Sequence, residues 1–134
     1  MKSKVDKLKR IEKLQKRMHD LSRWRLATLA RERDALATAH SQMLEALGEG
    51  LMSFGGAAAA GTRRIRSLEL EMVRADLTYE TQAKETFDRA VRSKTAERAL
   101  DSARTEHRHE LEKKSLSELI EWSLQSRDSG SHKP

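Results

Sequence analysis

Apolar residues recur every three or four positions through the first third of the chain. From Leu14 to Leu47 they fall on one narrow stripe, because each residue advances an α-helix by about 100°. A stripe this narrow, lasting about nine turns, is typical of a helix that packs against a partner helix. Its members are Leu14, Met18, Leu21, Leu29, Leu36, Met43 and Leu47. The pattern predicts a helix over residues 3–47.

The stripe is irregular near its middle. Taken as heptads, its phase slips by one residue between Leu21 and Leu29, which predicts a shallow supercoil. Arg25 and Glu32 lie inside the stripe, and Trp24 lies at its edge. Polar residues in a seam cost stability and fix the register of a coiled coil. They also occur where a partner helix is displaced, and the sequence leaves both interpretations open.

A second series of apolar residues begins after Gly61. Thr62 is a suitable N-cap residue, and the first apolar positions that follow have heptad spacing. The series continues with a small drift in phase through Ala83 and Phe87 and becomes sparse between Arg92 and Glu110. It predicts a helix over residues 62–125. The heptad positions that open the series are Ile65, Leu68, Met72, Ala75 and Tyr79.

Five of the six glycines lie between Gly48 and Gly61. Each glycine inside a helix costs roughly 1 kcal/mol relative to alanine, so this segment predicts a reversal of the chain. We therefore predict an all-α fold, in which two long helices form an antiparallel coiled-coil hairpin and the second helix is the longer. The hairpin forms one domain over residues 1–126, and the polar residues 127–134 form a disordered tail.

Folding at the reversal leaves the second helix with an unmatched end. It places Trp24 near Phe87 and Leu8 near Ser102, so roughly the last 20 residues of the second helix extend beyond the first. This end carries the richest apolar cluster of the chain, and an exposed cluster of that kind usually marks a binding site. The alternatives are a helix that bends back and a chain that dimerises there. The cluster consists of Leu111, Leu116, Leu119, Ile120, Trp122 and Leu124.

Composition supports a thin seam rather than a layered core. Apolar residues make up 37% of the 134 residues, aromatic residues 4% and charged residues 36%, as in coiled coils. The net charge is +6, and residues 1–33 alone hold twelve Lys and Arg against four Asp and Glu. Such a basic end attracts an acidic protein surface, a membrane or nucleic acid, unless it serves only as a solvated face.

The sequence offers no constellation for catalysis. The glycines at 48 and 50 lack the preceding strand and the lysine of a nucleotide-binding loop. His107 and His109 point about 200° apart on a helix and cannot share a metal ion, and without cysteine there is no thiolate site. We expect no enzyme, no cofactor, no metal and no small-molecule substrate. The basic start is not an export signal and no apolar run would span a membrane, so we expect a cytoplasmic protein.

The order of a basic first helix, a Gly/Met/Leu-containing reversal over Gly48 to Gly61, a longer second helix and a short polar tail resembles a known family. This is the flagellar type III export protein FliJ family, with its injectisome counterpart, the YscO family. The resemblance implies a stalk that docks with the hexameric export ATPase, regulates it and links it to the membrane export gate, with export chaperones as further partners. Such a protein would lie at the membrane only through its partners.

The resemblance also implies which residues bind. The gate would contact seam residues early in the second helix, and the ATPase would contact the helix ends far from the reversal. Leu51, Met52 and Phe54 at the reversal would touch either partner or cap the hairpin. The alternative function is a basic coiled-coil adaptor for oligomerisation or nucleic-acid binding. The gate residues would be Leu68, Met72, Ala75 and Tyr79, and the ATPase residues Lys4, Lys7, Arg10, Lys13, Leu116, Leu119 and Trp122.

Overall fold

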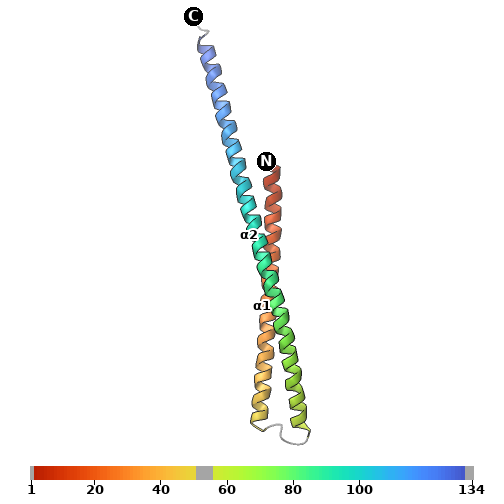
Figure 1. The fold of residues 1–134 in the computed structure, drawn as a ribbon. Coiled ribbons are helices and arrows are strands. Elements are labelled where there is room, and N and C mark those ends of the chain that lie inside the picture. Colours follow the sequence, from red (N-terminus) through yellow and green to blue (C-terminus); the bar gives the residue numbers. More distant parts are fainter. Residues whose placement is uncertain (1, 51–55, 132–134) are drawn as a thin grey trace. The chain divides into compact units, whose positions relative to one another are not determined.

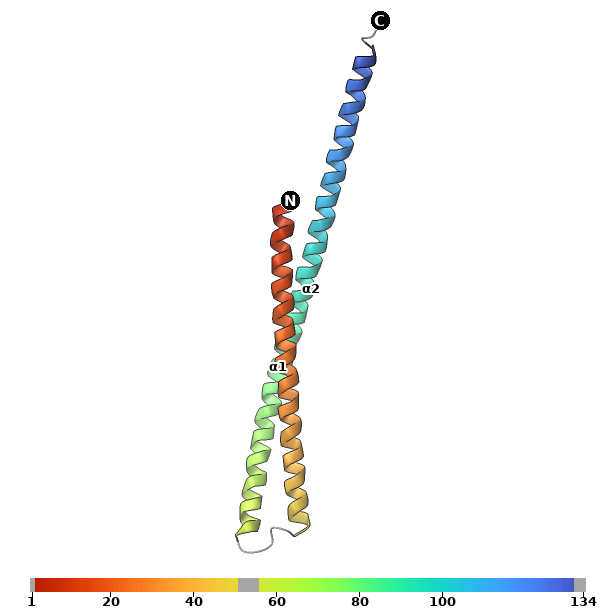
Figure 2. The ribbon, with the colours of Figure 1, turned by 180° about the vertical axis from the view of Figure 1, so that it is seen from behind.

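The chain folds into two long helices that pack against each other as a helical hairpin (Figures 1 and 2). The computed structural model describes residues 2–50 and 56–131. Helix α1 comprises Lys2–Gly48 and helix α2 comprises Ala57–Ser131, and the described residues include no strand. The predicted all-α hairpin with a longer second helix is confirmed.

The start and the end of α2 differ from the prediction. The helix begins at Ala57, before Thr62, whose hydroxyl donates a hydrogen bond to the Ala58 carbonyl oxygen at 3.0 Å instead of capping the helix. The run of alanines at 57–60 explains the early start, because alanine is the strongest helix former and outweighs Gly61. At the other end α2 continues to Ser131, so residues 127–131 are helical rather than disordered. Residues 51–55, with Leu51, Met52 and Phe54, lie outside the described residues.

A glycine in a left-handed conformation follows the last turn of α1. Gly50 has a φ of 73°, a left-handed conformation that glycine adopts without steric cost. The Gly50 amide donates to the Leu47 carbonyl oxygen at 3.1 Å, and the Glu49 amide donates to the Glu45 carbonyl oxygen at 2.9 Å. These bonds satisfy carbonyl groups that the end of a helix would otherwise leave unpaired.

The packing divides the chain into two units. The first unit combines Met1–Gln15 with Arg92–Pro134, and the second is Lys16–Val91. In the second unit Ser22 meets Thr86 and His40 meets Glu69, so the two helices run antiparallel. In the first unit the Lys4 ammonium lies 3.5 Å from a carboxylate oxygen of Glu106.

The least exposed positions of each helix follow heptad spacing without a break, and we call these positions the seam. On α1 the seam comprises Val5, Leu8, Glu12, Gln15, His19, Ser22, Leu26, Leu29, Arg33, Leu36, His40, Met43 and Leu47. On α2 it comprises Gly61, Ile65, Leu68, Met72, Ala75, Tyr79, Gln82, Thr86, Arg89, Ser93, Ala96, Leu100, Ala103 and His107.

The seam corrects the predicted stripe. The seam has no phase slip, because polar residues such as Ser22 occupy the heptad positions that hold no apolar residue. Leu14 and Leu21 are exposed, and so are Arg25 and Glu32, the two charges of the predicted stripe. Arg33 is the charged residue that the seam of the second unit contains on α1. The side chains of Trp24 and Phe87, which the sequence predicts to lie near each other, are both exposed.

Candidate partner-binding surfaces

The four residues expected to face the export gate lie in the seam of the second unit. Leu68 keeps only 1% of its surface exposed, and Met72, Ala75 and Tyr79 are half-buried. The Arg33 guanidinium lies over the Tyr79 ring, 4.0 Å from its centroid. These side chains therefore pack within the hairpin, and Leu68 offers no external surface to a partner.

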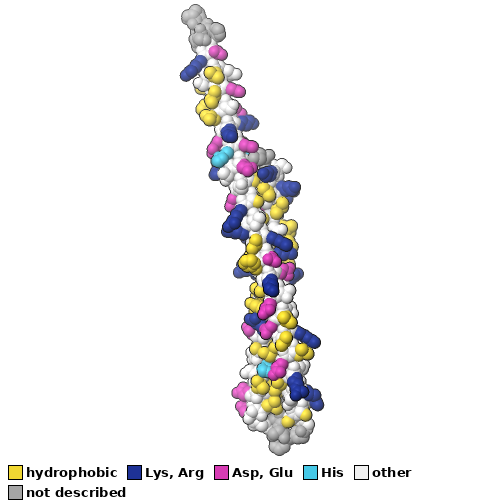
Figure 3. All heavy atoms as spheres, viewed as in Figure 1, with side chains coloured by type: hydrophobic (Ala, Val, Ile, Leu, Met, Phe, Trp, Pro, Cys, Tyr) yellow, Lys and Arg dark blue, Asp and Glu magenta, His cyan; other side chains and the backbone are white. Residues whose placement is uncertain are grey.

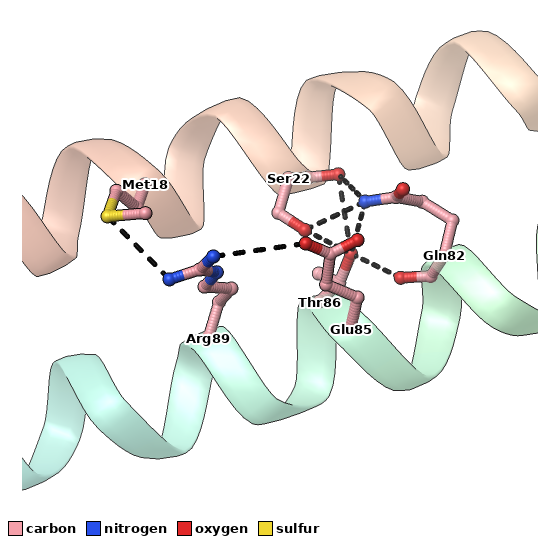
Figure 4. A network of polar contacts seen from close by, with 6 residues as sticks. All are labelled: Met18, Ser22, Gln82, Glu85, Thr86 and Arg89. Carbon is pink, nitrogen blue, oxygen red and sulfur yellow. Dashed lines mark hydrogen bonds and ion pairs between the residues drawn. The ribbon is translucent and has the colours of Figure 1, made fainter.

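A polar layer interrupts this seam (Figure 4). The hydroxyl oxygens of Ser22 on α1 and Thr86 on α2 are 2.9 Å apart, and both side chains are buried. The Gln82 amide donates to the Ser22 hydroxyl oxygen at 2.8 Å, and the Thr86 hydroxyl donates to the Gln82 carbonyl oxygen at 2.8 Å. Because these buried polar groups satisfy one another, the layer favours one register of α1 against α2.

Arg89 of α2 follows the polar layer in the seam. Its guanidinium lies 3.6 Å from the Met18 sulfur on α1 and 3.9 Å from a Glu85 carboxylate oxygen on α2 (Figure 4). A further cross-helix contact of the second unit joins His40 Nε2 and a Glu69 carboxylate oxygen at 3.2 Å. Together these contacts hold the two helices of this unit in one register.

In the first unit α2 continues beyond the residues that face α1. We call residues 108–127 the projecting segment; all of its side chains are exposed. Hydrophobic side chains gather at the surface near this end of α2 (Figure 3). The segment contains all the predicted apolar cluster, including Leu116, Leu119 and Trp122, and Trp122 is 66% exposed. The expected exposed cluster is therefore present.

The basic residues expected to meet the ATPase lie on α1 in the same unit. Lys4, Lys7, Arg10 and Lys13 are all exposed. Lys4 approaches Glu106 of α2, so one of the four charges is partly balanced within the unit. Their spacing of three residues turns them progressively around α1, so they form a broad basic surface rather than one narrow row.

The sequence interpretation missed a second surface, which lies on α2 in the second unit. Exposed apolar residues recur there with heptad spacing on the face opposite the seam, interrupted by Glu80 and Lys84. We call this set the outer stripe. The signal in the sequence is the heptad spacing of these exposed apolar residues. The outer stripe comprises Leu70, Val73, Leu77, Glu80, Lys84, Phe87 and Val91.

Among the described residues no group of His, Asp and Glu side chains is placed to hold a metal ion. Within the same residues neither helix has a stretch long and apolar enough to cross a membrane. Comparison of the chain with protein-family models, with curated proteins and with solved structures finds no match.

Proposed function

We propose that this chain is a non-enzymatic coupling protein that binds a partner through the projecting segment of α2. In its specific form, the chain is a stalk of a type III export apparatus, which docks with the hexameric export ATPase and links it to the export gate. The observation that supports docking is the exposure of six large apolar side chains within residues 108–127. The export role rests on the resemblance of the chain to the FliJ and YscO families.

The projecting segment has the pattern of a helix that binds in a groove. Leu116, Leu119 and Ile120 fall within about 100° of the helix surface, and Trp122 extends this face by about 60° beyond Leu119. Anchors at such spacing enter an apolar groove on a partner. Tryptophan is enriched among the residues that dominate binding energy, because its large side chain is desolvated on docking. The face therefore suits a partner with an apolar groove.

The two helices of the first unit have different roles in the proposed docking. In the projecting segment Glu118 lies beside the docking face and Glu121 lies opposite it, whereas Lys7, Arg10 and Lys13 lie exposed on α1. Basic side chains at the rim of an interface speed the encounter with an acidic partner surface more than they tighten the final complex. In the proposed function the projecting segment supplies affinity, and the basic surface of α1 supplies the steering.

The contact with the export gate has a structural requirement. Leu68, Met72, Ala75 and Tyr79 belong to the seam, and Leu68 is buried against α1. Binding of the gate to these four residues would require the two helices to separate in the second unit. The gate contact in this form is therefore coupled to opening of the seam.

The decisive experiment uses a purified flagellar-type export ATPase. ATP hydrolysis is measured while the full chain is titrated, and binding is followed by the fluorescence of Trp122 in a Trp24→Phe background. The expected result is a rise in hydrolysis and a blue shift, as Trp122 leaves water. Leu119→Ser and Trp122→Ser should abolish the rise. Leu44→Ser serves as the matched control, because Leu44 is also exposed but lies on α1 in the second unit.

Two results would contradict the proposal. If the chain neither binds nor stimulates the ATPase, the export role fails. If Leu44→Ser removes the stimulation as fully as Leu119→Ser does, docking is not specific to the projecting segment.

The exposed basic surface favours nonspecific nucleic-acid binding as a second candidate function. Lys4, Lys7, Arg10 and Lys13 would contact phosphates, and the affinity for duplex DNA would fall steeply with salt. The slope of log affinity against log salt concentration is proportional to the number of phosphate contacts. Replacing Lys7, Arg10 and Lys13 by alanine should then reduce this slope by the contribution of about three contacts. A mobility-shift titration at two salt concentrations tests this function independently of the ATPase.

A further inference from the structure

The outer stripe lies on the face of α2 that points away from the seam. Leu70 follows Leu68 of the seam by two residues, which is about 200° around the helix. Four of its five apolar members are more than half exposed, Phe87 most of all at 69%, and Val91 is 49% exposed. Because the stripe and the seam occupy opposite faces, another helix could cover the stripe without disturbing α1.

The spacing of the outer stripe is that of a coiled-coil seam. From Leu70 to Val91 its residues alternate steps of three and four, which is the spacing that keeps a row of side chains facing one partner helix. A scattered set of exposed apolar residues would not keep this phase over three heptads. The spacing therefore indicates a helical partner.

The order of residues from Val73 to Val91 makes this part of the stripe complementary to itself in the antiparallel direction. In the hairpin, a residue at the end of a three-residue step on one helix lies opposite a residue at the start of such a step on the other, as Ser22 lies opposite Thr86. The same rule for two antiparallel copies of the stripe places Val73 opposite Val91 of the second copy. The next layer then joins Leu77 and Phe87 of the two copies, so apolar residues meet apolar residues.

The two charged positions complete the match. In the same register Glu80 of one copy lies opposite Lys84 of the other, and the two-fold axis repeats this pair. Opposite charges facing each other in the centre fix the register, as polar residues do in coiled-coil seams. Arg74 and Asp88, which are exposed beside the stripe, come within reach of each other across the same axis.

A parallel arrangement lacks this complementarity. In-register parallel helices would place Glu80 opposite Glu80 and Lys84 opposite Lys84, and like charges in a seam disfavour association. The charges of the stripe therefore select the antiparallel pair. They also favour a second copy of this chain over an unrelated helix, which would have to reproduce the reversed order of apolar and charged positions.

We propose that the outer stripe is the interface of an antiparallel homodimer, in which α2 of one chain packs against α2 of a second copy around a two-fold axis. The interface has only a few apolar layers, so it lies at the small end of stable interfaces. The dimer should dissociate on dilution through a roughly micromolar range. This surface is separate from the projecting segment, so the proposal does not depend on the export function.

Charge exchange tests the proposal with the full chain. Sedimentation equilibrium is measured over a series of concentrations for the native chain, Glu80→Lys and Lys84→Glu. Each single variant places like charges in both central layers and should weaken the dimer by roughly tenfold or more. An equimolar mixture of the two variants restores opposite charges in both layers and should form a heterodimer. The double variant E80K/K84E should also regain the homodimer.

The controls separate this interface from its alternatives. Circular dichroism should show the same helix content in all variants, because Glu80 and Lys84 are exposed in the hairpin. Glu121→Lys makes the same exchange in the projecting segment and should leave the dimer intact. A native chain that stays monomeric at its highest soluble concentration overturns the proposal. So does a dimer that Glu121→Lys weakens as much as Glu80→Lys, or a mixture of the two single variants that fails to associate.

Discussion

Two faces of α2 in the second unit differ in burial although both are rich in apolar residues. Thr86, on the inner face, is 9% exposed, whereas its neighbour Phe87, on the outer face, is 69% exposed. The larger hydrophobic gain would come from burying Phe87. The side chain that is buried is instead the one whose position continues the heptads from Leu68 and Met72. Burial in this hairpin therefore follows the register of the whole helix rather than the hydrophobicity of single residues.

The two faces also differ in the kind of polar residue that they hold near the middle. The inner face has Gln82 and Thr86, neutral groups that hydrogen-bond to Ser22. The charge next to them in the seam, Arg89, is only half-buried. The outer face has Glu80 and Lys84, both exposed. Desolvation explains the difference, because burying a neutral hydrogen-bonded group costs much less than burying a charge. The inner face is built to stay closed, and the outer face can associate and dissociate.

The largest expected effect comes from shortening one apolar side chain on each face. Leu68→Ala removes a fully packed side chain and should lower the free energy of unfolding by about 2–4 kcal/mol. Leu77→Ala shortens an exposed leucine and should change it by less than about 0.5 kcal/mol. Urea unfolding followed by circular dichroism, at protein concentrations low enough to keep the chain monomeric, measures both.

Equal losses for the two variants would contradict the comparison. They would mean that Leu77 is covered in the monomer as Leu68 is, and that α2 has no exposed apolar face opposite the seam. A loss confined to Leu68→Ala would confirm that the seam alone stabilises the isolated hairpin.

The polar layer gives a smaller effect. Thr86→Val keeps the shape of the side chain but leaves the Ser22 hydroxyl and the Gln82 amide with fewer partners, so we expect a loss of about 1–2 kcal/mol. Thr78→Val is the matched control. The Thr78 hydroxyl donates to the Arg74 carbonyl oxygen at 2.9 Å, as Thr86 does to Gln82, but Thr78 is exposed. Urea unfolding of the two variants therefore isolates the contribution of the contacts to α1.

A neutral or stabilising Thr86→Val would show that the layer costs more than it contributes. Valine would then act as a better seam residue, and the role of the layer would be to select register rather than to stabilise. The same measurement with Ser22→Ala separates these cases, because it removes the other hydroxyl of the 2.9 Å pair.

The sequence predicted the helices, the reversal and the projecting apolar cluster because each rests on a local or additive signal. Leu116, Leu119 and Trp122 are exposed simply because the second helix is longer than the first. The phase of the seam could not be predicted in the same way. Its middle is polar, so the spacing of apolar residues leads to Leu21, which is exposed, instead of Ser22, which is buried. Which of two adjacent positions is buried depends on the partner helix.

The smallest expected effect tests that phase directly with two arginines of α1. Arg33→Lys removes the planar guanidinium that lies 4.0 Å from the centre of the Tyr79 ring, and a lysine ammonium replaces it poorly. We expect a loss of about 0.5–1 kcal/mol in the free energy of unfolding. Arg25→Lys makes the same exchange at an exposed position and should have no measurable effect. Arg25 belongs to the stripe defined by Leu21 and Arg33 to the seam defined by Ser22. If urea unfolding shows the loss for Arg25→Lys and none for Arg33→Lys, α1 presents its other face to α2. The pairing of Ser22 with Thr86, which sets the antiparallel register proposed for the outer stripe, is then wrong as well.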